Sequence, residues 1–166
     1  MNNKIVLASK SKVRKNILEN NGFNCIVKPA NIDEETVKES LTKEGATPLL
    51  ISKNLAELKA NKISEGLNGE VVVGADSVID LEGNIISKPS SRKEAMEILK
   101  KLNGKIHYLI SSVCVSKNGQ MIWNYTDKAS LTMKNMSNSD LEEYLSKIND
   151  EDLYACLLYT SDAADE

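Results

Sequence analysis

Two short segments of the sequence contain residue types that can handle a metal-bound polyphosphate. In the first, Ser9, Ser11 and Arg14 follow an apolar run. In the second, an apolar run rich in valine leads to Asp76, and Lys88 lies a little further on. Hydroxyl, guanidinium and ammonium groups bind phosphate oxygens, and a carboxylate binds a divalent cation or accepts a proton from water. The two segments therefore predict phosphate chemistry around Asp76.

Some of these residues also have a purely structural interpretation. A serine that caps a helix, followed by a solvated arginine, is common, so Ser9 and Arg14 could serve the helix alone. Asp76 could cap the turn after its strand. Lys59 lies on a largely apolar stripe of a long helix, where a lysine usually extends its ammonium to the edge but can also face an anion. Both interpretations stay open at this level.

An acidic cluster and a single histidine are further candidates. Asp33, Glu34 and Glu35 could share a metal ion with Asp76, although acidic residues are also favoured at the start of a helix. His107 lies in a predicted strand without a second histidine in the chain, which is more typical of a hydrogen-bonded strand residue than of a metal ligand. We do not expect it to be catalytic.

Hydrophobic periodicity and turn residues predict alternating strands and helices. Strands are expected at residues 4–8, 23–27, 70–79, 85–86, 106–115 and 121–133. Helices are expected after the caps Ser11, Thr47, Ser91 and Ser139, and a partly helical stretch after Asp33. The turns at 81–84 and 118–119 indicate hairpins. The expected fold is mixed α/β, with a partly antiparallel sheet and flanking helices, and with Asp76 at the carboxyl end of a buried strand where such sheets bind ligands.

Composition narrows the class of protein. The 166 residues are 41% hydrophobic and 27% charged, which suits a single globular domain, expected over residues 1–156. Residues 157–166 differ in character from what precedes them, and we expect a foreign tail there. The formal net charge of −3 is not typical of a protein that binds nucleic acid, so no nucleic-acid-binding surface is expected. Without a membrane-length apolar run or signal peptide, we expect a cytoplasmic protein that does not bind membranes.

Several familiar functional motifs are absent from the sequence. The three cysteines are scattered without a CxxC pair, so neither a disulfide framework nor a zinc site is expected. No Walker loop, GxGxxG fingerprint, HExxH or GxSxG motif occurs. The common kinase, dehydrogenase, zinc-protease and esterase mechanisms lose support.

The strings IVLASKSKVRKNIL, LAELKA, VVVGADSVI, SKP and NGKIHYLISSV, together with an Asp-Glu pair at 33–34, closely resemble the Maf family of nucleotide pyrophosphatases. The resemblance runs from Lys4 to about Cys156, and the order and spacing of the strings make it specific. It implies an elongated mixed α/β fold shared with inosine-triphosphate pyrophosphatases, an active site in a central cleft, and a homodimer at full length. It also implies that the C-terminal part of the family's domain is missing here.

The resemblance further implies a reaction and a set of roles. A nucleoside triphosphate is hydrolysed to a nucleoside monophosphate and diphosphate with Mg²⁺ or Mn²⁺, which removes non-standard nucleotides from the pool. Asp76 is the implied proton acceptor, Glu34 joins it around the metal, and the phosphates bind to four residues: Ser9, Arg14, Lys59 and Lys88. Phosphoryl transfer needs mainly positioning and charge neutralisation, so these parts are sufficient.

Two positions that separate substrates in the family are occupied by Val13 and Ser77, which differ from the usual residues. The resemblance therefore leaves the base open between dTTP or UTP and 7-methyl-GTP. Two other functions also stay open: a catalytically silent nucleotide-binding module that regulates cell division through a protein partner, and a nucleotidyltransferase. A pure binder would not need the carboxylate of Asp76, and a transferase would keep the nucleotide on an acceptor.

Overall fold

The computed structural model describes residues 4–150 and Leu153 and has the expected mixed α/β architecture. Its elements are, in order, β1 (Lys4–Leu7), α1 (Lys12–Asn20), β2 (Asn24–Val27), α2 (Glu34–Lys43), α3 (Pro48–Ser64), β3 (Val72–Leu81), β4 (Asn84–Ile86), α4 (Arg92–Leu102), β5 (Ile106–Lys117), β6 (Gln120–Thr132) and α5 (Asn138–Lys147). The strands form one sheet in the order β2-β1-β3-β5-β6, and β4 pairs with β3. The predicted fold class is confirmed.

The chain divides into two compact units, and the division runs through three long strands. The first unit comprises Met1–Val78 and Leu109–Ala129, and the second comprises Ile79–Tyr108 and Ser130–Glu166. The boundaries fall within β3, β5 and β6. Within the described residues, none of the helices is both long and apolar enough to cross a bilayer. The predicted foreign tail, 157–166, lies outside the described residues.

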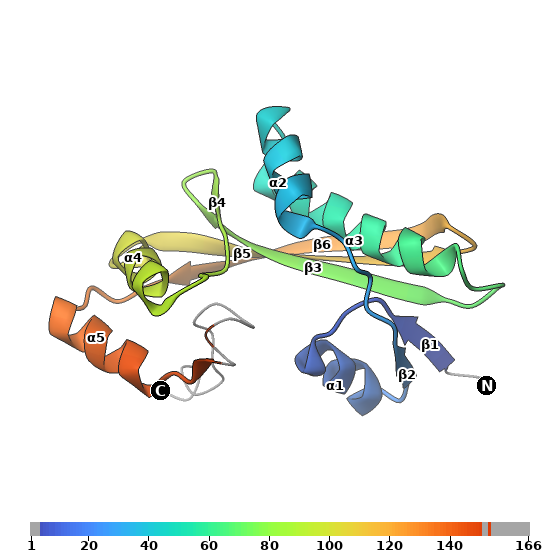
Figure 1. The fold of residues 1–166 in the computed structure, drawn as a ribbon, viewed down its shortest axis with the longest axis horizontal. Helices are drawn as coiled ribbons and strands as arrows, with labels where there is room; N and C mark the ends of the chain where they lie inside the picture. The colour runs from blue at the N-terminus through green and yellow to red at the C-terminus, as the bar shows by residue number, and fades with distance from the viewer. Residues whose placement is uncertain (1–3, 151–152, 154–166) are drawn as a thin grey trace. The chain divides into compact units, whose positions relative to one another are not determined.

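Within the first unit, β1, β2 and the start of β3 form a parallel part of the sheet that is covered on both faces. Strand β1 pairs in parallel with β2 and with β3, where Leu7 lies opposite Val73. Because side chains alternate along a strand, β1 serves two cores. Ile5 and Leu7 are buried in a cluster that Leu18 of α1 covers. Val6 and Ala8 face the other way, in a cluster with residues at and beyond the end of α3, so that α1 and α3 cover opposite faces (Figure 1).

Local capping explains where most helices begin. Ser11, Thr47 and Ser91 accept hydrogen bonds from the backbone N–H groups three residues later, as the sequence predicted. The two predicted hairpins also form: residues 82 and 83, and 118 and 119, all have positive φ, which is the geometry of a two-residue turn that follows the twist of the strands. Strand β4 pairs antiparallel with β3 across the first turn.

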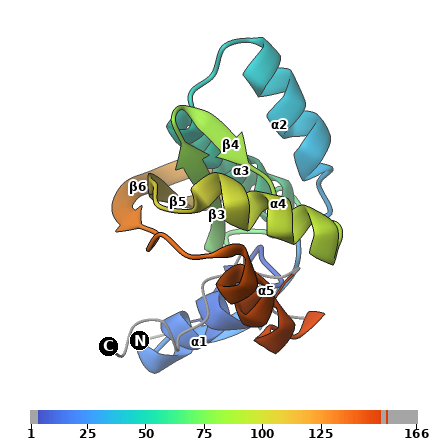
Figure 2. The same cartoon turned by 90° about the vertical axis from the view of Figure 1, so that its left-hand side faces the viewer.

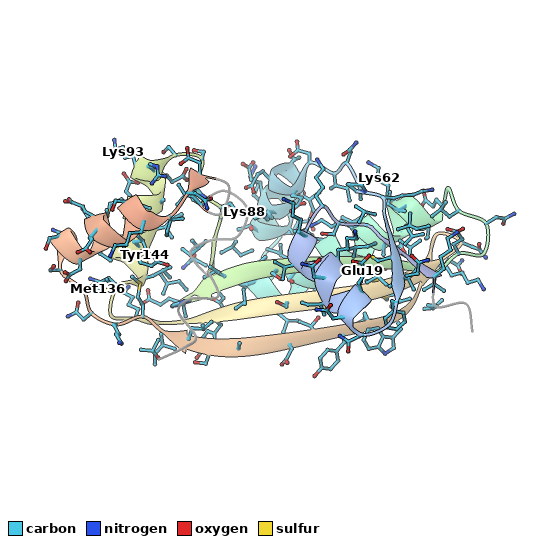
Figure 3. All side chains as sticks on the ribbon, turned by 90° about the horizontal axis from the view of Figure 1, so that it is seen from below. Glu19, Lys62, Lys88, Lys93, Met136 and Tyr144 are labelled. Atoms are coloured by element: carbon cyan, nitrogen blue, oxygen red, sulfur yellow. The ribbon has the colours of Figure 1, made fainter. Side chains whose placement is uncertain are left out.

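The second unit is built around the pairing of α4 with α5. Leu99 of α4 and Leu141 and Leu145 of α5 are buried in one apolar cluster, and Met136 and Tyr144 pack against it (Figures 2 and 3). The guanidinium of Arg92 donates to two backbone carbonyls at the C-terminal end of α5. This unit therefore has an ordinary apolar core and a charged group that completes a helix end.

One predicted cap is wrong. The helix α5 begins after Ser137, whose side chain accepts from Asp140 N–H in a complete capping box, and not after Ser139. Both serines have an acidic residue three positions later, so the local pattern is ambiguous. Asn103 decides between them, because its side-chain amide bonds both the N–H and the C=O of Met136 at 2.9 Å and fixes the chain just before Ser137.

Candidate active site

Asp76 lies in the middle of β3, not at its end as the sequence suggested. The strand continues to Leu81 because its second half pairs with β4. The pairing with β1, however, stops near Val73, since β1 itself ends at Leu7. Asp76 is therefore beyond the carboxyl end of the neighbouring parallel strand, which is the position where open α/β sheets expose groups to ligands.

Gly74 allows α3 to approach β3 closely. A Cβ at this position would lie 2.3 Å from the carbonyl oxygen of Ala56 and 2.7 Å from the amide nitrogen of Ala60, both in α3. No side chain fits at such distances. Because residues two apart in a strand share a face, Asp76 faces α3 as well. The small residues at this crossing bring the helix within reach of the carboxylate.

Two of the polar residues buried along α3, Ser52 and Lys59, bind Asp76. Ser52 is fully buried and donates from Oγ to the Asp76 carbonyl at 3.3 Å. Lys59, only 6% exposed, places its Nζ 2.8 Å from Asp76 Oδ1. The alternative in which Lys59 reaches bulk solvent is wrong. Instead its ammonium also lies 3.0 Å from Glu34 Oε1, so one lysine bridges two carboxylates.

The acidic cluster at the start of α2 separates into two roles. Asp33 is the helix cap: its carboxylate accepts from the N–H and the hydroxyl of Thr36. Glu34 is the first residue of the helix and turns towards Lys59. The capping interpretation therefore holds for Asp33, whereas Glu34 contacts Lys59, which also binds Asp76. That Glu34 joins Asp76 around a metal ion stays a prediction.

The carboxylate of Asp76 is held in an asymmetric environment. Burial raises its pKa above the ordinary aspartate value, and the nearby ammonium of Lys59 partly offsets this effect. Oδ1 accepts from Lys59, whereas Oδ2 is buried and has no hydrogen-bond partner among the described residues. A buried oxygen of this kind is costly unless something binds it. It is the strongest local indication of a ligand.

The side chain of Arg14 bonds the edge of β3 just beyond the end of β1. Val6 and Ala8 donate their N–H groups to the carbonyls of residues 71 and 73. The next carbonyl on that edge, Ala75 O, accepts instead from Arg14 Nη1 at 2.9 Å. The same Nη1 lies 3.2 Å from Ser9 Oγ. The guanidinium is therefore fixed at the edge of β3, next to Asp76 in sequence, at the N-terminal end of α1 where anions are favoured.

A chain of hydroxyls continues from Arg14 on the face of β3 opposite Asp76. Arg14 Nη2 donates to Ser77 Oγ at 3.3 Å, and Ser77 Oγ lies 3.0 Å from Ser111 Oγ of β5. Sequence reasoning missed Ser52 and Ser111. The buried periodicity of α3 could have identified Ser52, but no local pattern reveals which residue of β5 lies beside Ser77.

Two further predicted residues, Val13 and Lys88, are exposed. Val13, adjacent to Arg14, has 65% of its surface exposed. Lys88 is an exposed residue of the second unit, just beyond β4 (Figure 3). Their roles in base selection and phosphate binding stay predictions. His107 is buried in β5, also in the second unit.

The carboxylates fit a hard divalent cation. Asp76 Oδ2 and Glu34 would provide carboxylate oxygens from the same unit, and Mg²⁺ and Mn²⁺ prefer oxygen ligands. Within residues 4–150 and Leu153, no group of three or more His, Cys, Asp or Glu residues is arranged to hold a metal. Two carboxylates are nevertheless sufficient for Mg²⁺ when water and substrate phosphates complete its shell.

A model of the Maf-like protein family matches residues 4–157. This chain belongs to the Maf-like protein family. The family predicted from the sequence is confirmed, and the match includes every residue of the site described above.

Two named relatives agree with this assignment. A protein of Pelagibacter ubique named nucleoside triphosphate pyrophosphatase is 68% identical to the Maf-like chain over 155 residues, which cover 93% of the chain and 80% of the relative. A 7-methyl-GTP pyrophosphatase of Brucella abortus is 36% identical, covering 89% and 74%. Among solved structures, the Ham1 protein of Staphylococcus aureus matches with a TM-score of 0.48 and 17% identity, covering 77% of this chain and 69% of that one.

Proposed function

We propose that this protein is a nucleoside triphosphate pyrophosphatase, which hydrolyses a nucleoside triphosphate to a nucleoside monophosphate and diphosphate. The observation that carries the proposal is the convergence on one stretch of β3 of a buried carboxylate with an unpartnered oxygen and a guanidinium fixed by neutral acceptors. The name of the 68% identical relative supports the same activity.

The cationic residues hold the phosphates in this mechanism. Arg14 is fixed through Nη1 and through one bond from Nη2 to Ser77, and its remaining N–H groups can bind phosphate oxygens. Lys59 has three N–H groups, and the contacts to Asp76 and Glu34 use two of them. Ser9 adds a hydroxyl, and Lys88 is the fourth proposed phosphate ligand. These groups neutralise the charge of the phosphates and orient the bond to be broken.

Asp76 directs the attacking water. Lys59 holds Oδ1, so the other oxygen, Oδ2, is available. One of its two lone pairs accepts the water proton as the water oxygen bonds to phosphorus and the α–β bridging oxygen leaves with the diphosphate, and the second lone pair is left for the metal ion. The raised pKa of Asp76 makes it a better base than a solvated aspartate. Mg²⁺ or Mn²⁺, held by Asp76 and Glu34, would supply neutralisation of phosphate charge and polarisation of water.

Three finer features of the proposal rest on the family resemblance. Val13 and Ser77 select the base, the full-length protein is a homodimer, and it works in the cytoplasm on non-standard nucleotides. Val13 is exposed beside Arg14, as a residue that meets a ligand must be. Light scattering on the purified protein measures the oligomeric state, and a monomer at micromolar concentration would reject the homodimer.

The test is a panel of nucleoside triphosphates, including dTTP, UTP and 7-methyl-GTP, incubated with the protein and Mg²⁺ or Mn²⁺ while diphosphate is assayed. We expect release of diphosphate from at least one member, which also identifies the base. Nucleotide binding measured by calorimetry without any diphosphate release would reject the enzyme and favour a silent binding module.

A further inference from the structure

Ser111 of β5 is connected to Arg14 of α1 through Ser77 of β3. The distances are 3.3 Å from Arg14 Nη2 to Ser77 Oγ and 3.0 Å from Ser77 Oγ to Ser111 Oγ. All three residues belong to the first unit. We propose that Ser111 is a positioning residue for the phosphate-binding guanidinium and acts through the Ser77 hydroxyl. The proposal rests on the proposed function, in which Arg14 is a phosphate ligand.

The chemistry of the groups limits how this chain can be arranged. Arginine only donates, so Ser77 Oγ accepts from Arg14 and uses one lone pair for it. The contact with Ser111 then involves either the hydrogen of Ser77 or its second lone pair. Either way Ser111 sets the orientation of the Ser77 hydroxyl. If the chain runs from Arg14 through Ser77 to Ser111, each bond also polarises the next.

The two ends of the guanidinium fork are fixed differently. Nη1 is held by Ala75 O at 2.9 Å and by Ser9 Oγ at 3.2 Å. Nη2 is held by the longer bond to Ser77, which is an exposed residue whose hydroxyl water can reach. Ser111 is less exposed than Ser77 and supplies a protein partner that keeps this hydroxyl from turning to water. Loss of the Ser111 hydroxyl should therefore loosen the Nη2 end of the Arg14 guanidinium.

The strand supplies a matched control beside Ser111. Ser112 is buried and faces a different partner, with its Oγ 2.8 Å from Thr126 Oγ1. Ser112→Ala removes one hydroxyl from the same strand without touching the chain to Arg14. An effect that both variants show is a general consequence of altering β5. An effect that only Ser111→Ala shows is transmitted through Ser77 to Arg14.

Nitrogen NMR of the arginine side chains tests the connection without any catalysis. The sequence has only two arginines, and Arg92 bonds the end of α5 in the second unit, so it is an internal reference. In Ser111→Ala we expect faster rotation of the Arg14 guanidinium and unchanged Arg92 signals. Ser111→Thr, which keeps a hydroxyl, should restore the wild-type Arg14 signals. Unchanged Arg14 rotation in folded Ser111→Ala would overturn the proposal.

Kinetics with the nucleotide found by the panel test the consequence for the substrate. Loss of one bond in the chain should raise KM about three- to tenfold and change kcat less, because the bond positions a binding group. The double variant Ser77→Ala with Ser111→Ala should be no worse than Ser77→Ala alone. Additive effects would mean that Ser111 acts independently of Ser77, and the proposal would fail. If the wild type releases no diphosphate, the proposed function fails, while the NMR result still decides the connection.

Discussion

Asp76 and Ser77 are neighbours in β3, yet they face two different chemical environments. On the side of α3, Asp76 is buried and pairs with Lys59, which also binds Glu34. On the other side, Ser77 is exposed and bonds the guanidinium of Arg14 and the hydroxyl of Ser111. Opposite charges meet on the first face, whereas one positive charge is surrounded by neutral acceptors on the second.

This difference indicates a division of labour along one strand. Where water is largely excluded, electrostatic interactions are strong, and a carboxylate can have the raised pKa that a base needs. Where a guanidinium is fixed by hydroxyls and a carbonyl, its charge is not cancelled and stays available to an anion. In the proposed mechanism, the alternation of side chains in β3 therefore places the base, Asp76, and the phosphate ligand Arg14 on opposite faces of the strand and close together.

The largest expected effect comes from Asp76→Asn on the buried face. The amide keeps the size of the side chain and an oxygen for Lys59, but it cannot accept a proton from water. We expect diphosphate release to fall about a thousandfold or more, while nucleotide affinity changes little. Steady-state kinetics and calorimetry measure the two quantities. If Asp76→Asn lost nucleotide affinity while kcat stayed near the wild-type value, Asp76 would be a binding residue instead.

Gly74→Ala should disturb the buried face through the backbone. The new Cβ would clash with the backbone of α3 at Ala56 and Ala60, so the helix must move away and separate Lys59 from Asp76. We expect a loss of about 3 kcal/mol in the free energy of unfolding, measured by urea denaturation. Gly66→Ala is the control, because its Cβ would meet nothing closer than 3.8 Å. Equal stability of the two variants would contradict the close packing at Gly74.

Arg14→Lys should weaken the other face and leave the buried one intact. Lysine keeps the positive charge but cannot bond Ala75, Ser9 and Ser77 and still present a planar fork to phosphate. We expect KM to rise about tenfold with a smaller change in kcat. Arg92→Lys, in the second unit, should lower thermal stability without changing KM. A fall in kcat alone for Arg14→Lys would place Arg14 in the chemical step.

The smallest effect is a pH dependence of stability with opposite signs for two aspartates. The folded-state pKa of Asp76 is raised by burial, so the wild type loses stability relative to Asp76→Asn as pH rises through that pKa. Hydrogen bonds from Thr36 lower the pKa of Asp33, so its contribution is present above the ordinary aspartate pKa and is lost on acidification. Asp33→Asn should therefore lose stability relative to the wild type as pH rises. Thermal melts between pH 3 and 7 measure both, and equal signs would reject the burial effect at Asp76.

Local sequence rules predicted the elements well and the contacts between them less well. The caps at Ser11, Thr47 and Ser91 depend on residues three positions apart, so the sequence contains all that is needed. The observed cap at Ser137 depends on Asn103, far away in the chain, so the prediction of Ser139 as the cap was wrong. The same holds for Asp76, because the end of a strand depends on its partners, and β4 extends β3 beyond it.

The candidate site was predictable to the same extent: its residue types could be predicted from the sequence, but the contacts between its elements could not. The residue types of Ser9, Arg14, Glu34, Lys59 and Asp76 indicated phosphate chemistry, and the structure brings them together in the first unit. The direction in which Lys59 points could not be predicted, since it requires the close approach of α3 at Gly74. The contact of Ser77 with Ser111 could not be predicted either, because it depends on where β5 lies beside β3.

The most direct measurement is ³¹P NMR of the products formed from the preferred nucleoside triphosphate with Mg²⁺ present, since it identifies the bond that breaks. The arrangement around Asp76 predicts equal amounts of nucleoside monophosphate and diphosphate from the wild type and neither from Asp76→Asn. Release of orthophosphate and a nucleoside diphosphate, or wild-type rates in Asp76→Asn, would show that this carboxylate does not direct water to the α–β linkage.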